Sequence, residues 1–298
     1  TEDILITLKI TKSGHDIFFD FTGSDDQVLG NFNLTFNATQ SAVCYALKAL
    51  LDPEVPNNQG IFDAIRIEAP LGSFVNCVSP APVAMRANTC QRVVDVVIGA
   101  LAEALPDQVI GAANGANTSA VFSGIDPRNS QQYVYLETLG GGMGARATKD
   151  GKDGVQVNIT NTSNLPVEAI EMEYPLRVEG YALIADSGGA GKHRGGMGIR
   201  RSIRPVGHTC EFNGVGERFR NQPWGIFGGQ SGAAGMFEMV DCKGNTTSLS
   251  SKASRVKLSP DARVVISTPG AGGYGAPEDR KPEALAEDQA SGKYTKGF

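Results

Sequence analysis

The chain has 298 residues, of which 41% are hydrophobic and 20% charged, enough for a folded protein with one large core or two modest ones. Its net charge of −5 and isoelectric point near 5.3 give no electrostatic reason to bind nucleic acid or an anionic membrane. No stretch has the pattern of a signal peptide or a membrane span, and the five cysteines are dispersed without a CxxC pair, so we expect a soluble cytoplasmic protein with reduced thiols.

The first half carries strand patterns followed by helical ones. Residues 4–10 and 17–21 have large apolar residues at every second position, and Ser13-Gly14 between them is typical of a turn, which predicts a β-hairpin. Two helices are then predicted, because Asn37 with Gln40 and Asn88 with Gln91 resemble capping boxes that precede apolar residues at helical spacing. Further strands are predicted at 61–69 and 133–139, so residues 1–139 form an expected α+β region.

Glycine changes the character of the second half. Only nine of the 37 glycines precede residue 140, whereas 21 lie between Gly140 and Gly235. Residues 140–276 are therefore predicted to be a glycine-rich β region, followed by a C-terminal helix and tail over 277–298, with the helix at 282–291. Strands are expected at residues 155–160, 181–185, 236–240 and 264–267.

Together these elements predict an α+β fold with a helix-containing first half and a glycine-rich, β-rich second half. Glycine allows close approach of backbones, so we expect the glycine clusters to make subunit contacts.

Several segments resemble known catalytic or binding motifs but lack residues that those motifs require. Ser187 follows a strand as a nucleophile elbow would, but the glycines after it cannot sustain the helix that such an elbow needs. Gly191-Lys192 lacks the glycine and the hydroxyl residue of a phosphate-binding loop. The three histidines lack metal-site spacing. We therefore expect a glycine loop at Ser187 and no metal site in this chain, and we assign no catalytic residue.

Two groups of polar residues are candidates for contact with a substrate or a partner. Lys192, His193 and Arg194 stand between glycine pairs, where they could meet an anion, although a solvated surface cluster would look the same. Glu168 and Glu171 form the second group. In a strand, Glu171 would share a face with Glu173 as a carboxylate pair, or the glutamates could form salt bridges with nearby arginines.

A series of segments in one order resembles a known family. They are Asp20-Phe21-Thr22-Gly23-Ser24, Gly30-Asn31-Phe32-Asn33, Pro56-Asn57-Asn58-Gln59-Gly60, Pro70-Leu71-Gly72-Ser73, Gln91-Arg92-Val93-Val94-Asp95, Gly140 to Arg146, residues 160–168, Glu173-Tyr174-Pro175-Leu176-Arg177, Asp186 to Gly198 and residues 268–275. The series covers nearly the whole chain. It resembles the C-terminal half of hydantoinase B proteins, which include the matching part of 5-oxoprolinase and the alpha-type subunits of acetone and acetophenone carboxylases.

The resemblance implies a part of an enzyme complex that is inactive alone. Family members use ATP on an amide or ketone carbonyl, so the implied partners are a hydantoinase A-type nucleotide-binding subunit, a subunit that supplies the missing N-terminal half, and a small carbonyl substrate. This chain is then expected to bind no cofactor, with ATP and a divalent metal on the partner subunits. Since Thr1 could follow a removed initiator methionine, we expect a split gene product, most like a small acetophenone carboxylase subunit.

The reaction implied first is ATP-dependent carboxylation of a ketone by bicarbonate to a 3-oxo acid. Two alternatives stay open: a subunit of an ATP-dependent cyclic-amide hydrolase of the hydantoinase or 5-oxoprolinase type, and a noncatalytic scaffold of such a complex.

Overall fold

The structure is a computed structural model of the chain and describes residues 3–295. It divides into two compact units, Thr1–Ile110 and Gly111–Phe298. The division lies earlier than the change in composition at residue 139, because the strand Thr118–Ile125 pairs both with Gln132–Leu139 and with Cys210–Val215, far beyond that residue. Helices and strands occur in the first unit and strands dominate the second, which confirms the α+β fold class.

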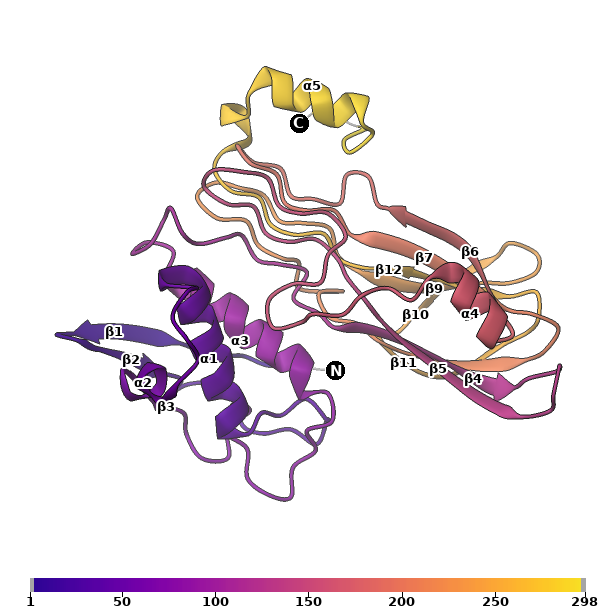
Figure 1. Cartoon of the computed structure of the whole chain (residues 1–298), viewed down its shortest axis with the longest axis horizontal. Coiled ribbons are helices and arrows are strands. Elements are labelled where there is room, and N and C mark those ends of the chain that lie inside the picture. Colours follow the sequence, from indigo (N-terminus) through magenta and orange to yellow (C-terminus); the bar gives the residue numbers. More distant parts are fainter. Residues whose placement is uncertain (1–2, 296–298) are drawn as a thin grey trace. The chain divides into compact units, whose positions relative to one another are not determined.

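The first unit combines a small sheet with three helices (Figure 1). Its elements are, in chain order, β1 (Lys9–Ser13), β2 (Asp16–Asp20), α1 (Phe36–Leu51), α2 (Gln59–Asp63), β3 (Ile65–Glu68) and α3 (Arg86–Ala100). β1 and β2 form an antiparallel hairpin around Gly14, whose φ of +58° favours glycine, and β3 pairs in parallel with β2. The turn of the hairpin was predicted, but its first strand lies later in the sequence than the predicted 4–10. α1 packs against α3.

Both long helices of this unit were predicted, but their N-termini are built differently. α1 begins at Phe36 after Thr35, and α3 begins at Arg86 after Met85, in each case without a side-chain cap. The predicted capping boxes are therefore wrong, because Asn37 and Asn88 lie within the first turns and not before them. The helices form nonetheless, since their apolar faces are buried and packing stabilises a helix more than its cap does.

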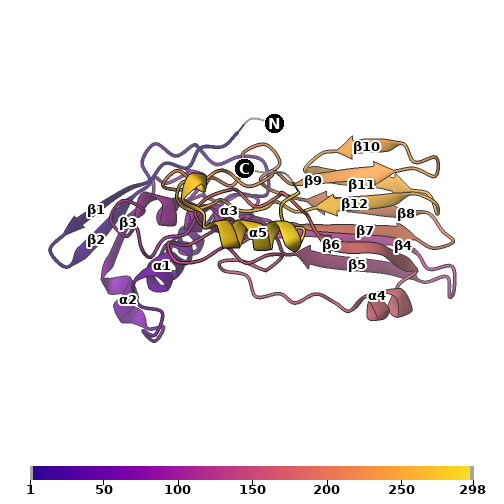
Figure 2. The same cartoon turned by 90° about the horizontal axis from the view of Figure 1, so that it is seen from above.

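The second unit is mainly a β-sandwich, seen from two directions in Figures 1 and 2. Its elements are β4 (Thr118–Ile125), β5 (Gln132–Leu139), α4 (Val167–Glu173), β6 (Leu176–Leu183), β7 (Ile199–Pro205), β8 (Cys210–Val215), β9 (Met236–Val240), β10 (Thr246–Leu249), β11 (Lys252–Leu258), β12 (Arg263–Ser267), the 3-10 turn η1 (Pro277–Asp279) and α5 (Pro282–Ala290). No helix within residues 3–295 has both the length and the apolarity required to cross a membrane.

The sandwich has two antiparallel sheets with strand orders β10-β9-β12-β7-β6 and β11-β8-β4-β5. Inward-facing residues of both sheets form one core, in which Phe212 packs against Phe122 of its own sheet and Phe237 of the other, with ring centroids 5.2 and 5.8 Å apart. One charged pair also crosses this core: fully buried Arg201 of β7 donates to Glu137 of β5.

The strand predictions for the second half are met in part. β9 matches the predicted 236–240, β12 contains 264–267, and α5 matches the predicted C-terminal helix at 282–291. Two predictions are wrong. Residues 155–160 form only an isolated bridge, at Val155, and the segment with Glu171 and Glu173 is helix α4 and not a strand.

Between the sandwich and α5, extended segments from distant parts of the sequence run side by side (Figure 1). We call this array the glycine bundle, and it comprises residues 111–116, 140–145, 151–154, 187–198, 223–235 and 269–275. The last of these is central. Its backbone N–H groups donate to three neighbouring segments: Gly272 to Ala112 at 2.8 Å, Ala271 to Gly196 at 3.0 Å and Gly273 to Gln230 at 2.9 Å.

The bundle requires glycine because its backbones touch. A Cβ added to Gly144 would lie 1.7 Å from the carbonyl oxygen of Gly111, and one added to Gly142 would lie 2.1 Å from that of Gly196. No side chain fits at such distances. The expectation that the glycines serve subunit contacts is therefore corrected, since their density is explained by packing within this chain.

Candidate functional site

Arg194, a candidate for contact with a substrate or a partner, is buried with 3% of its surface exposed. Its guanidinium donates two hydrogen bonds to Asp153, at 2.7 and 3.0 Å, and one to Asp288 at 3.1 Å. Its backbone N–H donates to Asp150 at 2.9 Å. The alternative of a solvated surface cluster is therefore wrong for Arg194, because a side chain with this many buried partners is part of the packing.

The C-terminal segment completes the arrangement around Arg194. Arg280 donates to both carboxylate oxygens of Asp150, at 2.8 Å each, and also to Asp288 of α5. The resulting group, called here the charged cluster, consists of Asp150, Asp153, Arg194, Arg280 and Asp288. It joins the glycine bundle to α5, which lies alongside the bundle in Figure 1.

The electrostatics of the charged cluster favour its ionised form. Burial alone would raise the pKa of Asp150, but the hydrogen bonds and charge of Arg280, with those of Arg194, outweigh it and hold that pKa below its ordinary value. Burial likewise disfavours the charged guanidinium of Arg194, yet Asp153 and Asp288 raise its pKa further above the ordinary range. Buried charges persist only when they are paired in this way. The cluster therefore has a structural role, in which its ion pairs hold α5 against the glycine bundle.

The two neighbours of Arg194 are more accessible. Lys192 is exposed, whereas His193 is partly buried and its Nδ1 lies 3.7 Å from a carboxylate oxygen of Asp150. Burial lowers the pKa of His193, although Asp150 opposes that shift. His193 also exchanges two backbone hydrogen bonds with Tyr274, at 3.0 and 2.9 Å. Within the group of Lys192, His193 and Arg194, the lysine is thus the residue most free to meet a partner.

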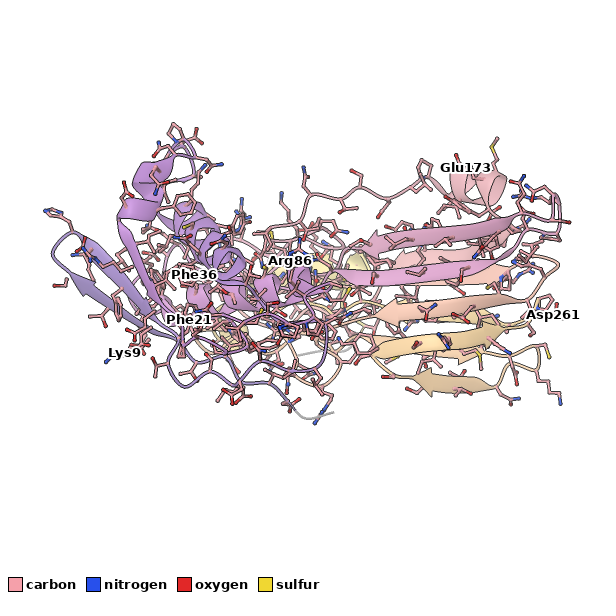
Figure 3. All side chains as sticks on the ribbon, turned by 90° about the horizontal axis from the view of Figure 1, so that it is seen from below. Lys9, Phe21, Phe36, Arg86, Glu173 and Asp261 are labelled. Carbon is pink, nitrogen blue, oxygen red and sulfur yellow. The ribbon has the colours of Figure 1, made fainter. Side chains whose placement is uncertain are left out.

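The predicted glutamates lie elsewhere in the second unit. Glu168 is exposed in the first turn of α4, and Glu171 accepts a hydrogen bond from the Val178 N–H at 3.0 Å and pairs with Arg177 at 3.4 Å. α4, marked by Glu173 in Figure 3, lies at the end of the sandwich remote from the glycine bundle. The structure therefore does not bring the glutamates together with Lys192 and His193, and the salt-bridge alternative holds for Glu171.

Ser187 has a structural environment. It is 2% exposed, its hydroxyl donates to the Ile184 carbonyl at 2.6 Å, and it accepts the Gly198 N–H at 3.0 Å. The chain continues from it into the glycine bundle and not into a helix. This agrees with the prediction of a glycine loop at this position.

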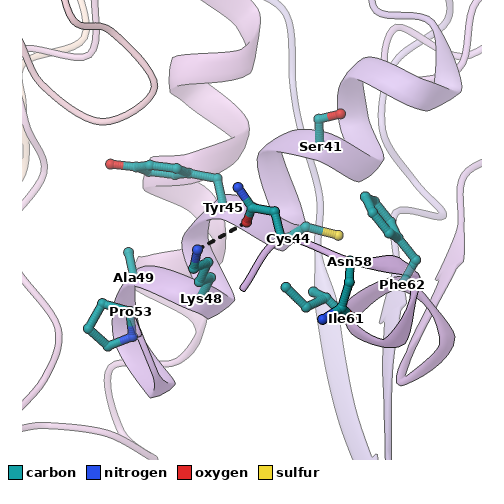
Figure 4. Close-up of a pocket in the computed structure, with 10 residues that line it drawn as sticks. Ser41, Cys44, Tyr45, Lys48, Ala49, Pro53, Asn58, Ile61 and Phe62 are labelled. Carbon is teal, nitrogen blue, oxygen red and sulfur yellow. Dashed lines mark hydrogen bonds between the residues drawn. The ribbon is translucent and has the colours of Figure 1, made fainter. Parts of the chain in front are cut away.

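A hollow that sequence reasoning missed lies in the first unit, between α1 and α2 (Figure 4). It measures about 510 Å³ and is lined by Ser41, Cys44, Tyr45, Lys48, Ala49, Pro53, Asn57, Asn58, Ile61 and Phe62. The lysine amine donates a hydrogen bond to the Asn57 side chain at 3.0 Å. A signal was present in the sequence, since Pro56 to Gly60 is one of the segments that carry the family resemblance, but nothing in its pattern showed that it borders a cavity.

Metal ligands do not gather anywhere in the described part of the chain. Among residues 3–295, no three or more His, Cys, Asp and Glu side chains are placed to hold a metal ion together. Although the charged cluster has three carboxylates, arginines occupy their oxygens. Its chemistry is that of an ion-pair network.

Comparison with known sequences finds relatives that match nearly the whole chain. The chain is 41% identical to an uncharacterized protein of Methanocaldococcus jannaschii, over 96% of this chain and 49% of that protein. It is 34% identical to a protein of Pseudomonas sp. that is named as one subunit of a D-/L-hydantoinase, over 99% of this chain and 50% of that protein. It is also 34% identical to 5-oxoprolinase 1 of Arabidopsis thaliana, over 91% of this chain and 21% of that protein.

Two solved structures share the fold. An ATP-dependent caprolactamase from Pseudomonas jessenii matches with a TM-score of 0.88 at 24% identity, over 97% of this chain and 52% of that one. An acetone carboxylase in its nucleotide-free form matches with a TM-score of 0.80 at 17% identity, over 98% of this chain and 44% of that one. The chain thus spans about half the length of these two proteins and of its first curated relatives, and a fifth of the oxoprolinase.

The family model described as hydantoinase B/oxoprolinase matches residues 1–277, which include the first unit and all strands of the sandwich in the second. The segments that carried the resemblance all lie within that range. The chain belongs to the hydantoinase B/oxoprolinase family.

Proposed function

We propose that this chain is one part of an ATP-dependent enzyme that opens a cyclic amide. One observation carries the proposal: over more than nine tenths of its length the chain is 34% identical to a protein named as a hydantoinase subunit and to a 5-oxoprolinase, and the names of both refer to cyclic amides. The caprolactamase supports the same proposal through its fold, since caprolactam is also a cyclic amide.

The chain acts in this proposal as a subunit and not alone. The Pseudomonas sp. relative is itself named as one subunit of its enzyme, and the chain spans about half of that protein. The proposed partners are a hydantoinase A-type subunit that binds ATP and the family half that this chain lacks, with a divalent metal on those parts. Because the charged cluster holds its carboxylates in ion pairs, it is better suited to supporting such a site than to building it.

An apolar surface in the second unit is suited to the absent half. Val134 and Leu136 project from the outer face of β5, with 57% and 63% of their surface exposed, and Ile125 at the end of the paired strand β4 is 56% exposed. Exposed apolar residues grouped on one sheet face are typical of a protein interface. Exposed Lys192 and Glu168 are proposed as polar contacts of the assembly.

A second reaction is proposed because of the acetone carboxylase fold. In that case the chain would belong to a ketone carboxylase of the acetophenone carboxylase type, which joins bicarbonate and a ketone to give a 3-oxo acid. Both reactions use ATP to activate a carbonyl oxygen, so one protein frame can serve either.

The native complex that contains this chain decides between the two reactions. We would purify it from its own cells through an affinity tag and measure ADP release with a panel of cyclic amides, and separately with ketones plus bicarbonate. ADP release with a cyclic amide, together with the ring-opened acid as product, is expected. Ketone-dependent ADP release with incorporation of labelled bicarbonate would instead establish the carboxylase.

A variant of the chain tests the proposed interface. Leu136→Asp places a charge on the proposed interface without touching the core, so it should reduce recovery of the partners while the chain itself stays folded. If the tagged chain is recovered only as a free monomer, and no ADP is released with any substrate, the proposed function is wrong.

A further inference from the structure

The hollow between α1 and α2 is bordered on one side by α2, a short helix without a fully buried residue. α2 spans only Gln59–Asp63 and has no buried residue, whereas α1 has six buried residues, of which Cys44 also lines the hollow. The two helices therefore stand apart, with the hollow of about 510 Å³ between them. A volume of this size is within the range that small-molecule sites occupy.

Apolar side chains line both sides of the hollow. Ile61 and Phe62 extend from α2 and are only partly buried, and across from them Tyr45 and Ala49 belong to α1 (Figure 4). Cys44 also points toward the hollow, and burial raises the pKa of its thiol, so the thiol is uncharged at neutral pH. An apolar body placed here would remove these surfaces from water, which favours binding.

Lys48 gives the hollow a charge. Its ammonium group donates to the Asn57 side chain at 3.0 Å, and within residues 3–295 it forms no ion pair with a carboxylate. A lysine in the last turn of a helix also stabilises the helix dipole, which accounts for its place on α1. The dipole does not account for the apolar cavity in front of it, and an unpaired cation beside apolar walls is complementary to an anion with an apolar body.

The loop between the two helices supports the same polar end. Asn57 orients Lys48, and Asn58 accepts the Gly60 N–H at 2.9 Å and so begins α2. Consecutive asparagines thus fix the cation and the helix that faces it. This gives a local reason for the Pro56 to Gly60 segment, which the proposed reaction leaves unused.

We propose that this hollow binds a small monocarboxylate with a short apolar chain. The carboxylate pairs with Lys48 and accepts from the Asn57 amide, and the chain lies among Tyr45, Ile61 and Phe62. The site is independent of the proposed reaction and would serve a ligand that binds this unit, whichever carbonyl the complex activates.

Hexanoate is the probe, titrated into the full chain while amide signals are followed by NMR. Saturable shifts are expected for residues 44–62. Lys48→Met keeps most of the stem but removes the charge, so affinity should fall about tenfold or more, as the loss of a charge-assisted hydrogen bond implies. Lys48→Arg should retain most of the affinity, and Lys257→Met, at an exposed lysine of β11, should leave it unchanged.

The apolar wall is tested by chain length and charge of the probe. Acetate should bind more weakly than hexanoate, and Phe62→Ala should reduce that difference, because the ring contacts only the longer chain. Hexylamine, with the same chain and the opposite charge, should not bind. The proposal is overturned if no shift saturates, if hexylamine binds as well as hexanoate, or if Lys48→Met retains the parent affinity with an unchanged thermal unfolding midpoint.

Discussion

The sandwich and the glycine bundle lie in one unit but are packed by opposite means. In the sandwich, side chains such as Phe122, Phe212 and Phe237 fill the space between two sheets. In the bundle, backbones lie so close that even a Cβ atom collides, as at Gly144 and Gly270, where the nearest carbonyl oxygen would be 1.7 and 1.8 Å away. Buried apolar side chains stabilise the sandwich, whereas the bundle is stabilised by backbone hydrogen bonds between segments whose glycines leave no side chain in the way.

This difference determines which mutations each region tolerates. Removing atoms from the sandwich leaves a cavity, whereas adding atoms to the bundle forces backbones apart.

The arrangement of backbone hydrogen bonds also differs between the two regions. Each strand bonds to one or two neighbours in a plane, while the central bundle segment at 269–275 bonds to segments around it. A defect in the bundle therefore reaches several segments together.

The largest effect is expected from Gly144→Ala. Its Cβ would overlap backbone that no rotamer change can move, so the free energy of unfolding of the second unit should fall by more than about 4 kcal/mol. Gly180→Ala is the matched control, because the nearest atom to its Cβ, on Ser202, is 3.8 Å away. Chemical denaturation of both variants is the measurement, and equal stability of the two would contradict backbone packing as the basis of the bundle.

Phe212→Ala should have the next largest effect. The side chain is fully buried between the rings of Phe122 and Phe237, and its removal should lower the free energy of unfolding by about 4 kcal/mol. Ala271→Gly, at a fully buried alanine of the bundle, should cost only about 1 kcal/mol. If both substitutions cost the same in denaturant titrations, side-chain volume contributes equally to the two regions and the contrast fails.

Arg194→Met tests the charged cluster at the border of the bundle. It leaves Asp153 and Asp288 without their shared donor, so a loss of about 3 kcal/mol is expected on thermal or denaturant unfolding. The double variant Arg194→Met with Asp288→Asn should lose less than the sum of the single losses. Strict additivity would show that the two side chains do not act as a unit.

The smallest effect is a dependence of stability on pH. Because the pKa of His193 is lowered from its ordinary 6.5 in the folded chain, protonation favours the unfolded state, so stability should decline as the pH falls below about 6.5. Asp150, whose pKa is lowered from 3.8, contributes stability that is lost only as the pH falls below about that value. His193→Gln should abolish the first decline in thermal midpoint and leave the second; a variant that retains both excludes His193.

The spacing of apolar residues predicted those helices and strands whose formation depends mainly on neighbouring residues. The Ser13-Gly14 turn and the alternation at residues 17–21 located the β1–β2 hairpin, although β1 overlaps the strand predicted at 4–10 only at residues 9 and 10. Helical spacing identified α1 and α3, because each helix buries one face regardless of the partner. β4 was missed, although its buried and partly buried residues alternate, since alanine, serine and glycine make its pattern weak. α4 was taken for strand because its seven residues are too few to show a period.

The candidate site was less predictable because its partners are far apart in sequence. Arg194 meets Asp288 across 94 residues, and nothing in the glycine loop distinguishes a buried arginine from an exposed one. The glycine clusters were visible, but the contacts that they permit depend on six segments meeting. Lys48 was not singled out for the same reason, because its hollow exists only once α2 stands opposite α1.

The central place of residues 269–275 also constrains biosynthesis. Every other bundle segment precedes this one in the sequence, so during synthesis those five emerge before the backbone groups at the centre exist to pair with them. They carry few large side chains with which to collapse in the meantime. Folding of the second unit is therefore expected to wait for residues 269–275 and to be slow, as for other structures dominated by distant contacts, and ribosome-bound chains that end before residue 269 should be readily cut by protease throughout the bundle.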